Sequence, residues 1–381
     1  MPILKGMAWD HPRGYDPMVA TSNEFKKKHS DYDIVWEKRS LQAFADRPIE
    51  QMAFDYDFMI IDHPHVGEAS RKGLLLELNH YEEYQKNLDI LSTQGLGLSH
   101  KSYEFNNNQY ALAIDAAAPV SAYREDLIDE IPKTYEDVIR LAENKKVMWP
   151  IKPVDAVSSF NSIAANIGNP INETDKKFVD RGIAISILKM MKKLSKLVPL
   201  ECFTMNPIDT LEYMSTNNDI SYCPLLYGYS NYSRNGFRDS IVKFTNRPSF
   251  NQDENNCSGS QIGGTGIAIS KQSKNIDIAL EYAFWIASEE CQKSTYYFSG
   301  GQPGNLEAWK DESINLDSNS FFKDTLETLD RAWLRPRYDG YMYFQDIAGT
   351  IINKYLSSDT SVESVIEELN IEFDKSFYAN K

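Results

Sequence analysis

The sequence predicts an α/β protein in which helices cover both faces of a parallel sheet. Its clearest strand is Phe58–Ile61, a run of four large apolar residues between Asp57 and Asp62. A short apolar run bounded by polar residues is typical of a strand buried on both faces. The segments before it alternate between strand and helix patterns, which indicates parallel strands joined by helices. A chain of 381 residues is also long enough for two domains.

Composition narrows the class of protein. Hydrophobic residues make up 42% of the chain and charged residues 25%, as in ordinary soluble globular proteins. The formal charge of −15 argues against nucleic-acid binding, which needs a basic surface. No apolar run of about 18 residues is present, so no membrane-spanning segment is expected. The cysteines lack the spacing of a zinc site, so we expect buried thiols, with one long-range disulfide as the alternative.

The first residues, MPILKGMAWD, do not resemble a secretory signal, because they lack its charged segment, long apolar segment and cleavage site. Two interpretations stay open. The protein is cytoplasmic, or its leader is absent from this sequence.

The first sixty residues establish the alternation of strands and helices. They predict, in order, a strand over Ile3–Ala8, a helix over Met18–Phe25, a strand over Asp33–Glu37 and a helix over Leu41–Ala53. We expect Asp16 to cap the first helix, with Pro17 in its first turn. Pro64 lacks a backbone donor and is therefore expected to end the Phe58–Ile61 strand.

Later segments are less regular. Strands are predicted over Gln109–Ile114, Val147–Ile151, Ile220–Tyr227 and Ser260–Ser270, and helices over Gly182–Leu197, Asp277–Ser288 and the region from about Phe321 onward. Thr134 is expected to cap a further helix. Tyr297–Gly304 is expected to be a turn-forming loop. Small residues around Pro119 suit a crossover between domains, because hinge positions absorb large backbone changes.

Three strand ends are expected to deliver polar loops to one edge of the sheet. These loops are Trp9–Tyr15, Arg39 with Ser40, and Asp62–His65. In open α/β sheets, ligands bind beyond the carboxyl ends of the strands. The three loops are therefore candidates for ligand contact.

Five segments carry a resemblance to a known family. They are MVATSNEFKKKHSDYDIVW, YDFMIIDHPHVGEASRKGLLLEL, NNNQYALAIDAAAPVSAYREDLIDEIPKTYEDV, NNDISYCPL and GGTGIAISKQSKNIDIALEYAFWIAS. In this order they resemble the family-one extracellular solute-binding proteins of ABC importers, the group that includes the maltose-binding proteins. The likeness spans nearly the whole chain.

The resemblance implies a two-lobed, type II periplasmic-binding-protein-like fold. Each lobe would hold a mixed sheet flanked by helices, with a ligand cleft between the lobes. Lobe one would take residues 1–112 and 265–310 and lobe two residues 113–264 and 311–381, with a hinge near 113–119 and 262–266.

The resemblance also implies a function. The chain would be a monomeric periplasmic or extracytoplasmic protein that captures a small polar ligand, a carbohydrate or a sugar-acid-like anion, and delivers it to an ABC permease in the membrane. Because no signal peptide is visible, a cytoplasmic enzyme or ligand sensor on the same scaffold is the alternative.

The first loop offers several ligand-binding groups. Trp9, His11, Arg13 and Tyr15 supply a stacking face, cations and hydrogen-bond donors, and Arg13 could grip a carboxylate or phosphate bidentately. The alternative is structural: Trp9 packs in the core, and Arg13 pairs with Asp10 or Asp16.

Asp62, His63 and His65 could contact a ligand, pack structurally, or form a metal site with His11. We favour ligand contact and expect no metal, because the rigid Pro64 need not bring the two imidazole rings together. Together with Arg13 and Arg39, the histidines favour an anionic or polyhydroxylated ligand over a cation.

The remaining candidates lie further along the chain. Aromatic faces can cover a sugar ring while their hydroxyls face water. The expected ligand contacts here are Asp115, Tyr222, Tyr227, Tyr229, Gly264, Thr265, Gln302 and Arg335. Packing of the tyrosines beneath lobe two and pairing of Arg335 with a nearby aspartate are the structural alternatives.

Enzymatic motifs do not stand out in the sequence. There is no GxSxG, HExxH or Cys/His nucleophile arrangement, and Gly263–Gly266 matches neither a dinucleotide fingerprint nor a lysine-bearing phosphate loop. Asp115 could serve as a general base, but no partner acid is identifiable. We therefore expect a binding protein without catalytic residues or cofactor.

Overall fold

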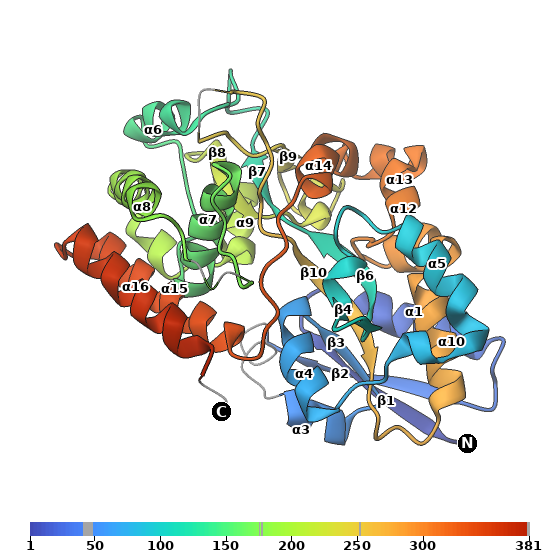
Figure 1. Cartoon of the computed structure of the whole chain (residues 1–381). Coiled ribbons are helices and arrows are strands. Elements are labelled where there is room, and N and C mark those ends of the chain that lie inside the picture. The colour runs from blue at the N-terminus through green and yellow to red at the C-terminus, as the bar shows by residue number, and fades with distance from the viewer. Residues whose placement is uncertain (41–48, 175, 177, 251–252, 379–381) are drawn as a thin grey trace. The chain divides into compact units, whose positions relative to one another are not determined.

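The computed structural model describes residues 1–40, 49–174, 176, 178–250 and 253–378 (Figure 1). The chain forms two compact units. Unit 1 comprises Met1–Ala116 and Gly263–Asn315, and unit 2 comprises Ala117–Ile262 and Leu316–Lys381. The predicted lobe boundaries at 112 and 265 concern the parts that would close on a ligand, and they stay a prediction.

Unit 1 is built on a five-stranded sheet with the order β2-β1-β3-β10-β6. The strands are β1 (Ile3–Trp9), β2 (Asp33–Arg39), β3 (Phe58–Ile61), β6 (Leu112–Ala117) and β10 (Gly263–Ile269). The first strand pairs in parallel with both β2 and β3, whereas β10 runs antiparallel to β3. The three predicted N-terminal strands are thus confirmed as a parallel group, and the return of the chain through β10 makes the sheet mixed.

Each face of this sheet has its own hydrophobic core. Phe58 and Ile60 lie in one cluster, together with residues of α1 (Asp16–Lys26) and α10 (Ile276–Ala287). Met59 and Ile61 point into a second cluster with residues of α3 (Ile49–Asp55) and α4 (Val66–Lys72). Burying each side chain contributes roughly 1.5–3 kcal/mol. The prediction that Phe58–Ile61 is buried on both faces is confirmed.

The first N-terminal helix begins at another residue than the sequence predicts, and the second is described from Ile49 onward. Asp16 does not cap α1, because the N-cap residue is Tyr15 and Asp16 is the first residue of the helix itself. Its charge still suits the position, since the helix dipole favours an anion in the first turn. Much of the predicted helix over Leu41–Ala53 lies outside the described residues, and α3 begins at Ile49.

The rest of unit 1 consists of short elements. They are α5 (Gln85–Thr93), β4 (Glu104–Phe105), β5 (Asn108–Gln109), α11 (Glu289–Cys291), the π-helical turn η7 (Gln292–Tyr296) and α12 (Leu306–Lys310), followed by α13 (Glu312–Asp317), which runs into unit 2. The predicted strand Gln109–Ile114 is therefore split between β5 and β6.

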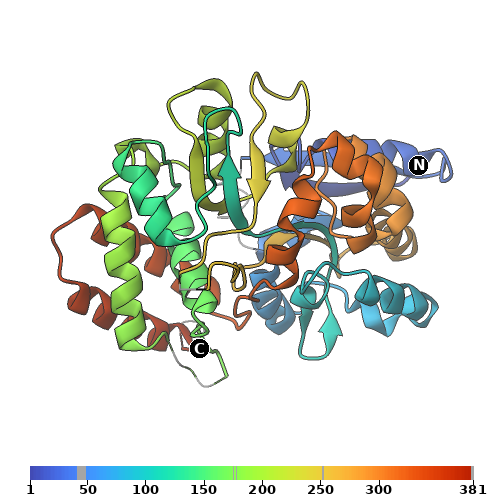
Figure 2. The ribbon, with the colours of Figure 1, turned by 90° about the horizontal axis from the view of Figure 1, so that it is seen from above.

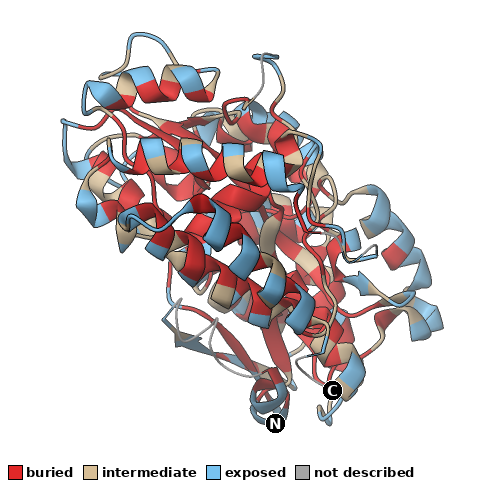
Figure 3. Ribbon diagram, turned by 60° about the vertical axis from the view of Figure 1, so that its left-hand side comes forward, coloured by how far each residue is buried: buried red, intermediate tan, exposed pale blue. Residues whose placement is uncertain are grey.

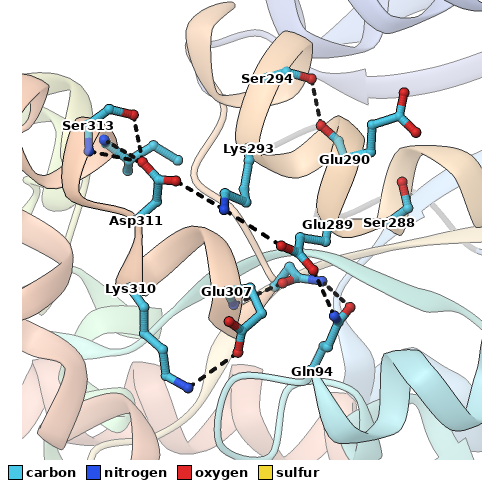
Figure 4. Close-up of polar contacts among 12 residues, drawn as sticks. Gln94, Ser288, Glu289, Glu290, Lys293, Ser294, Glu307, Lys310, Asp311 and Ser313 are labelled. Atoms are coloured by element: carbon cyan, nitrogen blue, oxygen red, sulfur yellow. Dashed lines mark hydrogen bonds and ion pairs between the residues drawn. The ribbon is translucent and has the colours of Figure 1, made fainter.

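A charged network holds the π-helical turn in place. Figure 4 shows Lys293 between Glu289 and Asp311, and its ammonium lies 3.6 and 3.1 Å from their carboxylates. Ser294, within the turn, has non-helical backbone angles (φ −122°, ψ −105°). Hydrogen bonds from Ser313 and from the Lys293 ammonium lower the pKa of Asp311 to about 2. The network fixes the turn that leads into the Tyr297–Gly304 segment.

Unit 2 contains a three-stranded antiparallel sheet with β7 (Pro119–Tyr123) between β8 (Tyr222–Tyr227) and β9 (Lys243–Thr245). Its helices are α6 (Tyr135–Glu143), α7 (Pro153–Asn166), α8 (Arg181–Ser195), α9 (Pro207–Thr216), α14 (Phe321–Asp330), α15 (Tyr341–Ser357) and α16 (Val362–Ser376). Helix α15 packs on α7, α8 and α16, and Figure 2 shows these green and red helices together.

Local signals explain several unit 2 elements. Thr134 caps α6 as predicted, and its side chain forms a reciprocal capping box with Asp137. The predicted strand Val147–Ile151 is wrong, because only Val147 makes a bridge, to Tyr222. Pro150 has no donor to extend a ladder, and the Ile151 amide bonds to the Cys202 carbonyl instead.

The cysteines behave as predicted from their spacing. All four are buried free thiols: Cys202, Cys223, Cys257 and Cys291.

Among the described helices, none combines the length and apolar character that crossing a membrane requires.

Candidate functional site

The predicted gathering of three polar loops at one sheet edge is confirmed by the strand order. Strands β2, β1 and β3 are neighbours and parallel, so their carboxyl ends face the same edge. Trp9–Tyr15 follows β1, Arg39 ends β2, and Asp62–His65 follows β3. The side chains at this edge nevertheless differ widely in accessibility.

Arg13 and Asp115 form a buried ion pair beside this edge. The guanidinium Nε lies 2.7 Å from one carboxylate oxygen and Nη2 lies 2.6 Å from the other. The side chains are 4% and 0% exposed. The expectation that Arg13 would pair with Asp10 or Asp16 is wrong, and Asp10 instead accepts a hydrogen bond from Lys38. The pair ties the loop after β1 to β6.

Two features of the surroundings of Asp115 act on its pKa in opposite directions. Burial raises its pKa, and the neighbouring Arg13 guanidinium works against that shift. A bidentate pair of this kind is strongly directional. The two side chains therefore hold each other in place in this structure, and their contact with a ligand stays a prediction.

Trp9 occupies the core rather than the loop surface. It is 5% exposed and belongs to the hydrophobic cluster that contains residues of α1 and α10. Its ring covers Gly14, where an added Cβ would lie 2.3 Å from the indole. His11 is also buried, and its Nδ1 accepts a hydrogen bond from the Arg13 amide. These contacts support the structural interpretation of Trp9.

Tyr15 and Arg39 are half-buried and engaged with neighbours. The Tyr15 hydroxyl donates to the Trp36 carbonyl at 3.4 Å. Arg39 donates from Nη2 to the Tyr56 hydroxyl at 3.1 Å, and Tyr56 donates in turn to Glu37. Arg39 therefore remains at the edge, with its charge partly accessible.

The loop after β3 forms a short 3₁₀ helix, η1 (His63–His65), capped by Asp62. The Asp62 carboxylate accepts from the His63 amide at 2.9 Å, and His63 Nδ1 lies 3.2 Å from the same oxygen. His63 is buried against the Tyr103 ring, whereas Asp62 and His65 are half-buried. The three side chains therefore lie in different environments. This agrees with the expectation that the rigid Pro64 need not bring the two imidazole rings together.

The glycine-rich strand and the later loop contribute mostly to packing. Gly264 has φ +96°, and a Cβ there would lie 2.2 Å from the Asp115 carbonyl oxygen. Thr265 is buried. Gln302 is fully buried and donates to the Ala116 carbonyl at 2.8 Å. These contacts hold β6, β10 and the Gln302 loop together.

The unit 2 candidates also divide into buried and accessible groups. Tyr222 is fully buried and shares a hydrogen bond with Ser121, and burial raises its pKa. The Tyr227 hydroxyl is half-buried and accepts from Gln261. Tyr229 is buried. Arg335 is buried and donates to Gln345 at 3.0 Å.

A pocket of about 440 Å³ lies within unit 2, in a region that the sequence patterns did not single out. Its lining comes from the loop after α7 and the segment before α15: Gly168, Asn169, Pro170, Ile171, Asn172, Glu173, Trp333, Leu334 and Pro336. Its volume lies within the roughly 300–1,000 Å³ typical of small-molecule sites.

Trp333 is the aromatic residue of this pocket, and its backbone is firmly held. Its amide donates to the Ser260 carbonyl and its carbonyl accepts from the Ile262 amide, both at 2.8 Å. The side chain is half-buried. The backbone bonds fix the position of this residue, and an indole face can cover the apolar face of a sugar ring.

The polar groups around Trp333 suit hydroxyl groups better than anions. Glu173 is the one charged residue in the lining, and its carboxylate accepts from the Arg337 amide at 3.1 Å. Asn169 exchanges hydrogen bonds with Asp180, which fixes the loop. Carboxylate and amide groups accept or donate to sugar hydroxyls, whereas a carboxylate repels an acidic ligand.

Trp333 is not among the site residues that the sequence predicts, which in this segment include Arg335. The available signal was an aromatic residue directly before LRPRY, together with a Gly-Asn-Pro loop after a helix. Within the described residues, no group of three or more His, Cys, Asp or Glu side chains is placed to hold a metal ion.

Comparison with known proteins identifies the fold. No family model matches the chain. Maltose-bound MalE3 of T. maritima superposes with a TM-score of 0.84 at 16% identity, covering 98% of this chain and 99% of that one. A solute-binding protein of an ABC transporter from Agrobacterium radiobacter K84, in complex with ribitol, gives 0.82 at 18% identity and covers 98% of each chain.

A third solved structure, an ABC transporter solute-binding protein from Thermotoga lettingae bound to α-D-tagatose, gives a TM-score of 0.82 at 16% identity and covers 99% of this chain and 100% of that one. The first of these proteins is bound to maltose, and the other two are solute-binding proteins of ABC transporters. The chain therefore has the α/β fold of the maltose-binding-protein-like solute-binding proteins of ABC transporters, as the sequence resemblance predicted.

Proposed function

We propose that this chain is the solute-binding protein of an ABC importer, that it captures a small polyhydroxylated ligand outside the cytoplasm, and that it delivers this ligand as a monomer to a membrane permease. The observation that carries the proposal is the fold, which matches sugar-bound and polyol-bound proteins over nearly the full length of both chains. Because fold alone does not fix function, the ligand class must be argued from the site.

Trp333 and its pocket support a neutral carbohydrate or polyol. The pocket combines the Trp333 indole with Asn169, Asn172 and Glu173, and Glu173 alone of its lining residues is charged. This favours a neutral sugar over the sugar-acid alternative raised by the sequence. From unit 1, Arg39, Asp62 and His65 are the proposed contacts that lie partly exposed at the sheet edge.

Other sequence candidates take a supporting role in the proposal. Arg13, Asp115 and Gln302 hold the loops of unit 1 through buried hydrogen bonds. Trp9 and Tyr222 fill cores. Their replacement is expected to act on stability first and on ligand affinity only as a consequence.

Calorimetric titration with maltose, ribitol, tagatose and a matched set of sugar acids tests the proposal. We expect micromolar binding of at least one neutral sugar or polyol, equivalent to roughly 8 kcal/mol. Trp333→Ala should weaken that binding at least about tenfold, because stacking area is lost. Tyr343→Ala, which removes another partly exposed unit 2 aromatic, serves as the control and should bind normally. Tight binding of acids alone would exclude the neutral-sugar assignment.

A further inference from the structure

Four lysines on α8 and at its C-cap form a positive surface that the function above does not use. Lys189, Lys192, Lys193 and Lys196 follow the spacing i, i+3, i+4, i+7, which places them on one helix face. They line a single open pocket of about 380 Å³ together with Glu143, Leu197 and Tyr355. We call these four residues the lysine patch.

Among the described residues, the charges of the lysine patch are not neutralised by carboxylates. In this they differ from lysines such as Lys72, which pairs with Glu50 and Glu68, and Lys271, which pairs with Glu77. In the described part of the chain, none of the four patch lysines forms an ion pair with a carboxylate, although the whole chain carries a formal charge of −15. Like charges at these spacings repel each other within a helix.

The helix dipole explains only part of this arrangement. Lys192 and Lys193 lie in the last turn of α8, where cations are favoured. Lys189 lies one turn earlier, beyond the reach of that effect. Lys192 is also held in place, with its ammonium 4.4 Å from the centre of the Tyr355 ring and bonded to the Ser358 carbonyl. The other three are exposed to solvent.

The chemistry of the patch favours an extended anionic surface over a single chelated anion. Lysines provide compact point charges, whereas bidentate recognition of one phosphate or carboxylate is the strength of arginine, and no arginine lines this pocket. Apolar side chains adjoin the charges, since Leu197 lines the pocket and Leu200, just past α8, is 81% exposed. Lysines beside apolar groups are typical of membrane-surface contacts.

Figure 3 turns the side of Figure 1 that carries α6, α8 and α16 toward the viewer and shows exposed residues along the outer faces of its helices. Salt screens charges beyond about 10 Å at 0.1 M ionic strength. Acidic residues farther from the patch than this are therefore screened from it, and Glu143 is the acidic residue that lines the pocket beside the four lysines.

We propose that the lysine patch docks the protein on a membrane surface rich in anionic phospholipid, in an orientation set by α8. The inference rests on the proposed function in that it places the protein beside a membrane, but it concerns a different surface from the sugar site. The patch would concentrate the protein near its permease without inserting a helix.

Co-sedimentation with vesicles of phosphatidylglycerol and phosphatidylcholine tests this proposal. The full chain should bind phosphatidylglycerol vesicles at low salt and release as salt rises, with little binding to pure phosphatidylcholine. Replacing all four patch residues by glutamine (K189Q, K192Q, K193Q and K196Q) should lower the partition coefficient roughly fivefold for each lysine and at least about 100-fold in total.

A matched variant separates the patch from overall charge. K5Q, K28Q, K86Q and K274Q remove the same number of positive charges from exposed positions in unit 1, and this variant should bind vesicles like the unaltered protein. Equal vesicle binding by the two variants would overturn the proposal, as would binding to soluble polyphosphate without binding to vesicles. Sugar calorimetry on the same variants tests the proposed sugar binding independently of vesicle binding, because the variant that lacks the lysine patch should keep its full sugar affinity.

Discussion

At the scale of single residues, the buried ion pair between Arg13 and Asp115 gives two residues that the sequence offered as ligand contacts a structural role. Both side chains are almost completely buried, and each satisfies the other bidentately. Removing one member of such a pair leaves an uncompensated buried charge, which typically costs about 3–5 kcal/mol.

Asp115→Ala should therefore lower the free energy of unfolding by about 3–5 kcal/mol, measured by urea denaturation. Asp10→Ala breaks the exposed pair with Lys38 and should change stability far less. If the two variants lost the same small amount, Arg13 would have to find another partner or reach water easily, and its structural role would be lost.

Asp155 provides a second residue-scale prediction, this time on pH. It lies in the first turn of α7, and its Oδ2 is buried with no hydrogen-bond partner among the described residues. Burial raises its pKa from 3.8 to about 8, with Lys152 opposing the shift and Asp209 adding to it. The folded state therefore favours the protonated carboxyl.

The direction of the pH effect follows from this raised pKa. The stabilisation is fully present below the unfolded-state pKa near 3.8 and is lost as pH rises toward about 8. Asp155→Asn keeps the group neutral, so it should lessen the loss of stability between pH 5 and pH 8, by up to about 1.4 kcal/mol per pH unit. Urea denaturation at both pH values measures this, with the exposed Asp359→Asn as control. Identical pH slopes in all three proteins would contradict a neutral Asp155.

At the scale of elements, β10 meets β6 so closely that a side chain is excluded. Gly264 has φ +96°, and an added Cβ would lie 2.2 Å from the Asp115 carbonyl oxygen. Gly73, at the C-terminal end of α4, also has positive φ, at +62°, but no atom lies within 4 Å of its added Cβ. The two glycines therefore separate backbone strain from crowding.

Gly73→Ala should cost about 1–2 kcal/mol, the price of a left-handed conformation alone. Gly264→Ala should cost more than about 3 kcal/mol, because the main chain of β6 must also move. Thermal and urea denaturation of both variants measure the difference. Equal losses would show that β6 yields easily, and the close approach would then have no energetic importance.

Elements with strong local signals could be predicted from the sequence. Phe58–Ile61 was located to the residue because its apolar run is sharply bounded, and Thr134 because its side chain can accept a bond from the third helical residue. The strand predicted over Val147–Ile151 was wrong because its apolar pattern resembles a strand, while strand pairing depends on a partner distant in the sequence. The need for glycine at position 264 could not be predicted either, since it arises from a contact with β6, which is distant in the sequence.

The site was harder to predict than the fold. Strand order correctly brought His11, Arg39 and His65 to one sheet edge, because parallel strands end together. It did not say which side chains would turn inward, and Trp9 and Arg13 both did. Trp333 was missed because its position depends on backbone bonds to Ser260 and Ile262, more than seventy residues earlier.

At the scale of the whole molecule, the chain passes between its two units three times, after Ala116, Ile262 and Asn315. Several crossings restrict the relative motion of two units to a hinge more than a single flexible linker does. A ligand shifts such an equilibrium only by the difference between its affinities for the two states. Closure on the ligand is therefore the motion that the proposed function requires.

Small-angle scattering tests this requirement directly. Addition of the sugar found by calorimetry, at about 100 times its Kd, should lower the radius of gyration and stabilise the fold by about 2.7 kcal/mol. At a sugar concentration equal to the Kd of the unaltered protein, about half of that protein is bound but only about a tenth of Trp333→Ala, so the variant should stay closer to the ligand-free radius. Binding that stabilises the protein but leaves the radius unchanged would assign the sugar to one unit alone, and capture by closure would then be wrong for this chain.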